Sequence, residues 1–205
     1  MQTLLKLSRA IDSVTDFIGR QAYWLTLVAV LISAGNAIIR YAFNSSSNAW
    51  LELQWYLFSA IFLLCGGYTL LHGQHVRIDV IYSRFSRRTQ LYIDVFGTLF
   101  FLMPMAILIM VLSWPVFVNA YVGNEHSSNA GGLVVWPARL LLPVGFFLLV
   151  MQGVSELIKR IAILRGLIPD PAAEESGPTA EEELAREIAE AQAKRDAPAP
   201  APAVS

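Results

Sequence analysis

The side chains with the most chemical potential lie in a short polar stretch, residues 72–80 (HGQHVRIDV), between two apolar segments. His72 and His75 stand three residues apart, a spacing that places two imidazoles on one side of a helix end, where they could offer two ligands to a metal ion. We find no Cys, Asp or Glu placed to complete such a site. The pattern therefore favours interfacial histidines over a metal centre.

Redox chemistry has equally little support in the sequence. The single cysteine, Cys65, lies inside an apolar segment, so the chain forms no internal disulfide and builds no thiolate metal site. A bis-histidine haem would need imidazoles on facing helices at membrane depth, but the third histidine, His126, falls between two apolar segments. We therefore predict no catalytic residue, no metal and no cofactor, and hence no enzyme.

Two acidic residues are candidates for contacts rather than for catalysis. Glu52 lies in the run 50–56 (WLELQWY) at the edge of an apolar segment, where the N-terminus of a helix would favour its carboxylate. It is either a cap at the level of the lipid headgroups or a contact to another subunit. Asp79 lies near His75 and Arg77, and either neutralises this basic turn or fixes the turn against a partner.

The elements that must position these side chains are membrane spans. The chain is 55% hydrophobic and 15% charged, with a mean hydropathy of +0.50, which is too apolar for a water-soluble domain of 205 residues. Its net charge of −1 gives no indication that it binds nucleic acid. A bilayer core takes about 20 helical residues per crossing. We predict an all-α integral membrane protein with four transmembrane helices, at about residues 22–39, 53–71, 95–118 and 139–158. The third contains Pro104 and Pro115, so we expect it to be tilted or kinked.

The cations beside the spans predict the orientation, because short loops rich in Lys and Arg stay in the cytoplasm. Ten cations precede the first span, follow the fourth, or lie between the second and third, whereas only Arg40 and Arg139 border the other loops. Both termini are therefore expected in the cytoplasm. Residues 1–20 lack the apolar region of a cleaved signal peptide, so we expect the first span to remain as an anchor.

Amphipathic helices are predicted on the cytoplasmic side. Apolar residues recur at alternating steps of three and four across residues 4–18, and at helical spacing across residues 78–85. The first of these helices could lie in the membrane interface or dock on another subunit, and its cations favour the interface. The second is expected to lie in the membrane plane and to link spans two and three.

The C-terminal segment has a different character. Residues 1–168 form the predicted membrane domain, whereas residues 169–205 are rich in Ala, Pro and Glu and cannot bury a core. We predict a disordered cytoplasmic tail. No internal repeat indicates the architecture of a self-sufficient transporter, and the polar residues midway through the spans are few: Asn36, Ser59, Thr69 and Gln152.

A family resemblance rests on the order of these features. Glu52 opens the second span, Gly66 and Gly67 lie within it, and the string HVRID at 75–79 precedes a basic turn at 84–88. Over residues 1 to about 168 this order resembles the small membrane subunit of tripartite ATP-independent periplasmic (TRAP) transporters, the DctQ family. Segments 129–137 (NAGGLVVWP) and 140–146 (LLLPVGF) resemble a branch labelled for mannitol, chloroaromatic or 2-oxo acid uptake.

The resemblance implies a system of the bacterial inner membrane. A periplasmic binding protein would capture an organic acid, a large membrane subunit would carry it inward with sodium, and the small subunit, surrounded by lipids, would brace the large one and help to dock the binding protein. The residues implied at the large-subunit interface are Glu52, Gln54, Trp55, Tyr56, His75, Arg77 and Asp79. Those implied in docking of the binding protein are Tyr121, Glu125 and His126.

Two functions of other classes remain open at this stage. A stand-alone small transporter or channel, with a pore shared between copies, would transport without any other chain. A membrane-anchor subunit of an enzyme would bind haem or quinone and a soluble catalytic partner.

Overall fold

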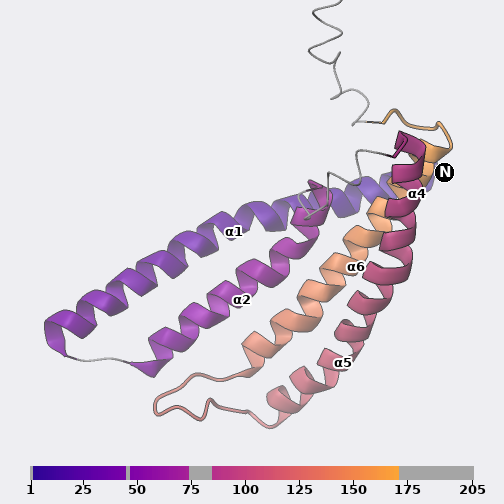
Figure 1. The fold of residues 1–205 in the computed structure, drawn as a ribbon. Helices are drawn as coiled ribbons and strands as arrows, with labels where there is room; N and C mark the ends of the chain where they lie inside the picture. Colours follow the sequence, from indigo (N-terminus) through magenta and orange to yellow (C-terminus); the bar gives the residue numbers. More distant parts are fainter. Residues whose placement is uncertain (1, 45–46, 74–84, 171–205) are drawn as a thin grey trace, which may run out of the picture. The chain divides into compact units, whose positions relative to one another are not determined.

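The computed structural model describes residues 2–44, 47–73 and 85–170. These ranges contain four helical segments that are long and apolar enough to cross a membrane: α1 (Gln2–Phe43), α2 (Asn48–Leu71), the run 87–122, and α6 (Trp136–Leu164) (Figure 1). The described residues form no strand, and their isolated β-bridge pairs His126 with Val134. The prediction of an all-α fold with four apolar helices of membrane-spanning length is confirmed, and each helix extends beyond the predicted span at one or both ends.

The chain divides into two compact units, residues 1–165 and residues 166–205. The four helices belong to the first unit, and every contact below lies within it. The predicted boundary between a membrane domain and a tail at residues 168 and 169 stays a prediction, because the chain beyond residue 170 lies outside the described residues.

Within the first unit, α2 packs between α1 and α6, and α6 packs between α2 and α5 (Figure 1). We call the end where α1 ends and α2 begins, and where α5 is joined to α6, the loop end. The opposite end, where α1 begins and both α2 and α6 end, is the terminal end. There α1 also contacts α6, because α1 continues past the end of α2.

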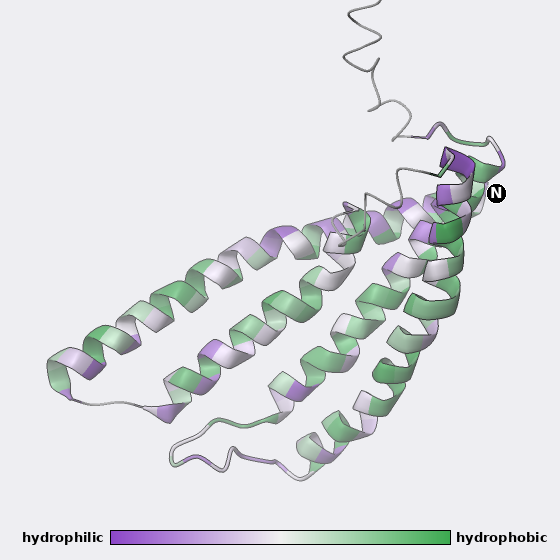
Figure 2. Ribbon diagram, in the orientation of Figure 1, coloured by the Kyte–Doolittle hydropathy of each residue, from purple (hydrophilic) through white to green (hydrophobic). Residues whose placement is uncertain are grey.

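The helices consist mainly of apolar residues (Figure 2). Only 11% to 33% of the most apolar window of each helix is buried within the chain, and Phe62 on α2 is 80% exposed. Apolar faces of this extent fit a hydrocarbon environment or the helices of another membrane subunit. The chain is therefore a multi-pass membrane protein by length, composition and exposure of its helices.

The amphipathic N-terminal segment and the first span form one helix of 42 residues, α1. Ser8, Ile11, Thr15 and Gly19 are buried at steps of three and four along it, so this segment turns one stripe toward α2 and α6. Its predicted position in the membrane interface stays a prediction. The second predicted amphipathic helix falls mainly on residues 74–84, outside the described residues; from the N-cap Ser86 onward, α4 (Arg87–Gly97) leads directly into the third span.

The third span contains an irregular turn before its first proline. Between α4 and α5 (Met103–Val122) lies η1 (Thr98–Leu102), a stretch of π-helix. Pro104 follows it and has no N–H for the carbonyl four residues back, so a wide turn at this point accommodates the missing hydrogen bond. Pro115 lies inside α5, which continues to Val122.

Glycines permit close approach of the helices. A Cβ built on Gly19 would lie 2.1 Å from the Tyr68 ring, and one on Gly145 would lie 2.8 Å from the backbone oxygen of Leu63. Small residues at such points let backbones approach and gain dispersion contacts where lipid offers no hydrophobic driving force. Of the Gly66–Gly67 pair, Gly67 contacts α1 and α6, whereas Gly66 faces open space.

Candidate functional site

Three side chains on one face of α2 hold the loop that joins α5 to α6. Asn48, Glu52 and Tyr56 are spaced by four residues, so they line one face of the first turns of α2. Asn48 Nδ2 donates to the carbonyl oxygen of Ala130 at 3.0 Å, and the Tyr56 hydroxyl donates to that of Val134 at 3.1 Å. We call these three residues the clamp and residues 123–135 the outer loop.

Glu52 is the centre of the clamp. One of its carboxylate oxygens accepts hydrogen bonds from the Ser127 hydroxyl and from Asn129 Nδ2, the latter at 2.8 Å. The other accepts from the backbone N–H of Leu133 at 2.7 Å. The residue is 6% exposed. A carboxylate buried to this extent is stable only when donors replace its water shell, and the outer loop supplies these donors.

The outer loop also has internal order. The N–H of Ser127 donates to the Leu133 carbonyl and the N–H of Val135 to the Glu125 carbonyl, both at 2.9 Å, which closes the loop like a short hairpin. Gly131 at its tip has a φ of +71°, a left-handed conformation that a residue without Cβ adopts at low cost. These bonds keep the donors of residues 127, 129 and 133 close enough together to meet a single carboxylate.

An ion pair joins the start of the loop to α6. Arg139 donates to both carboxylate oxygens of Glu125, at 2.5 and 2.6 Å, in a bidentate pair. Next to it, the ring of Tyr121 packs edge-to-face on Trp136 with centroids 5.4 Å apart, while Tyr121 remains 59% exposed. The three residues predicted to dock the binding protein, Tyr121, Glu125 and His126, thus lie together at the loop end and are exposed. Their docking role stays a prediction.

The residues predicted to meet a large subunit are distributed differently. Trp55 is 67% exposed, whereas Gln54 is buried and Glu52 and Tyr56 face the outer loop of the same chain. His75, Arg77 and Asp79 lie outside the described residues. The contact of these seven residues with another subunit stays a prediction. The sequence did not indicate the engagement of Glu52 by its own loop, because nothing local marks Ser127, Asn129 or Leu133 as its donors.

A polar network lies at the terminal end, between α1 and α6. Asp12 Oδ1 accepts from Gln152 Nε2 at 2.9 Å and from the Ser155 hydroxyl at 2.6 Å, and Lys159 Nζ lies 3.2 Å from Asp12 Oδ2. Ser8 and Ser155 share a further hydroxyl contact at 2.7 Å. By sequence alone, Gln152 is an isolated polar residue within a span, and Lys159 is a charge that indicates orientation. The available signal was their spacing on α6, where residues 152, 155 and 159 share one face.

A second ionic cluster ties the start of the third span to the end of α6. Arg160 forms ion pairs with Asp94 of α4 and, within α6, with Glu156 at 3.5 Å. Glu156 is 7% exposed and also pairs with Lys159 at 2.5 Å. Asp94, Glu156, Lys159 and Arg160 are thus engaged in structural contacts. Within the ranges that the structure describes, no group of three or more His, Cys, Asp or Glu could hold a metal ion.

Comparison with protein families identifies the chain. Residues 28–162, more than half of its length, match the family described as tripartite ATP-independent periplasmic transporters, DctQ component. The chain belongs to the DctQ family. No curated protein and no solved structure matched it. As a DctQ protein it is the small membrane subunit of a TRAP transporter. The family is one of transporter components rather than of enzymes, and it works with a large membrane subunit and a substrate-binding protein.

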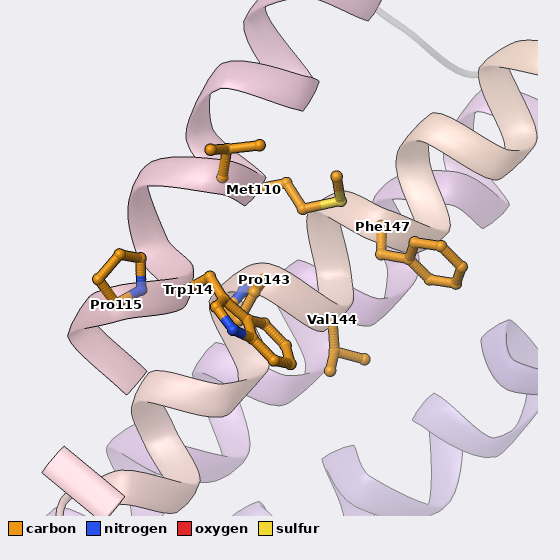
Figure 3. Close-up of a pocket in the computed structure, with 7 residues that line it drawn as sticks. Met110, Trp114, Pro115, Pro143, Val144 and Phe147 are labelled. Carbon is orange, nitrogen blue, oxygen red and sulfur yellow. The ribbon is translucent and has the colours of Figure 1, made fainter. Parts of the chain in front are cut away.

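Two grooves of this DctQ chain are apolar. One of about 600 Å³ lies between α5 and α6, where Met110 and Trp114 extend toward Pro143 and Val144 (Figure 3). Another of about 580 Å³, between α2 and α6, includes Phe62 and Gly66. A site for an organic acid needs convergent polar groups, which neither groove offers. Such grooves fit lipid chains or apolar helix faces.

Proposed function

We propose that this chain is a small permease subunit that braces the large subunit of its TRAP transporter and helps to dock the periplasmic binding protein. The transporter takes up an organic acid, a 2-oxo acid or another carboxylate, across the bacterial inner membrane, driven by sodium. The family match over residues 28–162 carries this proposal. The hydrogen bonds of the polar side chains support it. A transport pathway through this chain would need polar groups, and those of the clamp and of the terminal-end network are already bonded within the chain.

Bracing follows from the exposed helix faces. Trp55 and Phe62 on α2 and Tyr41 near the end of α1 are 67%, 80% and 88% exposed. Large aromatic residues are enriched where membrane helices meet partners or headgroups, and Trp55 belongs to the predicted large-subunit interface with Glu52, Gln54 and Tyr56. On the cytoplasmic side the sequence adds His75, Arg77 and Asp79 to this interface.

Docking follows from the predicted orientation. With both termini in the cytoplasm, the loop end faces the periplasm. It presents Tyr121 of α5, together with Glu125 and His126 of the outer loop, to the binding protein. The hydrogen bonds to α2 and the ion pair to α6 hold this surface in one conformation. A surface that is ordered before docking loses less entropy on docking.

The deciding experiment is uptake into proteoliposomes under an inward sodium gradient. Three samples are compared: this chain alone, this chain with its large subunit, and both membrane subunits with the binding protein, each supplied with labelled 2-oxo acids and other carboxylates. Uptake only by the full set supports the proposal. Uptake by the chain alone would favour the stand-alone transporter, and haem absorption of the purified chain would favour an enzyme anchor.

Asp79→Ala tests the cytoplasmic part of the proposed interface. The substitution removes the carboxylate from the HVRID string, and we expect less large subunit to copurify with the chain. Unchanged copurification together with unchanged uptake would remove Asp79 from the interface.

A further inference from the structure

Glu52 occupies a position from which one side chain bonds to both arms of the outer loop. Its donors come from residues 127, 129 and 133, on both arms of the hairpin-like loop. The residue itself is fixed in α2, which packs against both α1 and α6. The side-chain hydrogen bonds of Glu52 thus join a packed helix to the loop.

We propose that Glu52 is a positioning residue for the binding protein: its carboxylate holds the outer loop in the conformation to which the binding protein docks. This inference rests on the proposed function, and it adds a role that Glu52 fulfils without touching the binding protein. Because the residue is 6% exposed, it acts through Ser127, Asn129 and Leu133.

Glu52 contributes more to this role than the two other clamp residues. Asn48 and Tyr56 each give one neutral hydrogen bond to a loop carbonyl. Glu52 accepts three bonds on an ionised group, and charge-assisted bonds are about twice as strong as neutral ones. Its loss also leaves three loop donors without their acceptor, so the loop has reason to rearrange.

The expected consequence separates docking from transport. A loop released from α2 must be ordered each time the binding protein docks, which raises the concentration of binding protein needed for half-maximal uptake. The maximal rate at saturating binding protein changes little, because under the proposed function the large subunit, and not the clamp, carries the substrate. A residue needed only for folding would instead reduce the amount of complex and the maximal rate together.

The test uses the complete complex in proteoliposomes, with the binding protein titrated and both membrane subunits quantified. Glu52→Gln keeps the size of the side chain but replaces one acceptor oxygen by a donor, and we expect the half-saturating concentration to rise about tenfold. Ser127→Ala removes one donor and should raise it about threefold. Ser47→Ala is the matched control, since Ser47 is exposed, makes no side-chain hydrogen bond at the N-cap of α2 and lies outside the outer loop, so the concentration should remain unchanged.

Hydrogen exchange of the same complexes reports on the loop without the binding protein. The amide of Leu133 donates to Glu52, so it should exchange faster in Glu52→Gln and remain protected in Ser47→Ala. If Glu52→Gln assembles poorly, Ser127→Ala and Asn129→Ala decide by the same two measurements.

Each failure has its own signature. If wild-type uptake depends on the binding protein but the Glu52, Ser127 and Asn129 variants keep its half-saturating concentration, the positioning role is overturned while the proposed function stands. If wild-type uptake does not depend on the binding protein, both the proposed function and this inference are overturned.

Discussion

Asp12 of α1 and Lys159 of α6 form an ion pair across 147 residues of sequence, with 3.2 Å between Oδ2 and Nζ. The same carboxylate accepts hydrogen bonds from Gln152 and Ser155. The beginning of α1 is thereby attached to α6 beyond the end of α2. The amphipathic N-terminal segment thus has a polar attachment within its own chain.

Asp12→Asn should destabilise the chain. The substitution removes the charge that Gln152, Ser155 and Lys159 share, and hydrogen bonds to a charged group contribute about 1.5–3 kcal/mol each, so we expect a loss of about 2 kcal/mol after rearrangement. Thermal unfolding of the purified protein in detergent measures it. The matched control is Asp16→Asn, which breaks an exposed i,i+4 pair with Arg20 that contributes about 0.3–0.5 kcal/mol and a longer contact of 3.8 Å to His72. Equal shifts for both variants would show that the network adds nothing beyond a surface pair.

Gly145→Ala tests the close approach of α2 and α6. The new methyl group would lie 2.8 Å from the Leu63 backbone, which cannot move without separating the helices, so we expect a loss of about 1–3 kcal/mol. Gly66→Ala is the control, since no atom lies within 4 Å of the added Cβ and removal of a helix glycine stabilises by up to about 1 kcal/mol. Unfolding of the isolated chain compares the two. A neutral Gly145→Ala would contradict the tight contact.

The bidentate pair of Glu125 and Arg139 should couple measurably. Their side chains are 45% and 32% exposed, so solvent screens the pair and a double-mutant cycle with Glu125→Gln and Arg139→Gln should give about 1 kcal/mol or less. The coupling should decline as salt is raised from about 0.1 M to 1 M, because the screening length falls from about 10 to 3 Å. A coupling that is independent of salt would indicate that packing, and not charge, joins the two residues.

Gln152→Met probes an unsatisfied group. Gln152 is fully buried; its Nε2 donates to Asp12, while its Oε1 has no hydrogen-bond partner within the described part of the chain. Methionine keeps the volume, removes one bond and also removes the unsatisfied oxygen, so the two effects offset and stability should change by less than about 1 kcal/mol. A loss as large as that of Asp12→Asn in the same unfolding assay would show that the oxygen is satisfied in the native state.

The number and place of the helices followed from composition. Hydrocarbon forces a spanning backbone to satisfy its own hydrogen bonds, so long uncharged segments predict helices without knowledge of their neighbours. Helix ends were less predictable. The helix α1 already begins at Gln2, because no strong helix breaker separates the amphipathic segment from the first span. Gly19 lies inside this helix, at the point where it packs closely against the ring of Tyr68. Pro104 did indicate an irregular third span, although not the π-helical form that precedes it.

The pairings were decided by the tertiary structure alone. The sequence drew attention to Glu52 through its position and to the family through the order of its motifs, but a helical period shows which residues share a face and not which element meets that face. The donors of Glu52 are 75 to 81 residues away, and those of Asp12 are 140 to 147 residues away. Only the packing of α1, α2 and α6 brings these groups within hydrogen-bond distance. The sequence therefore determined a four-helix DctQ subunit. The tertiary structure decided which residues hold its outer loop and its N-terminal segment.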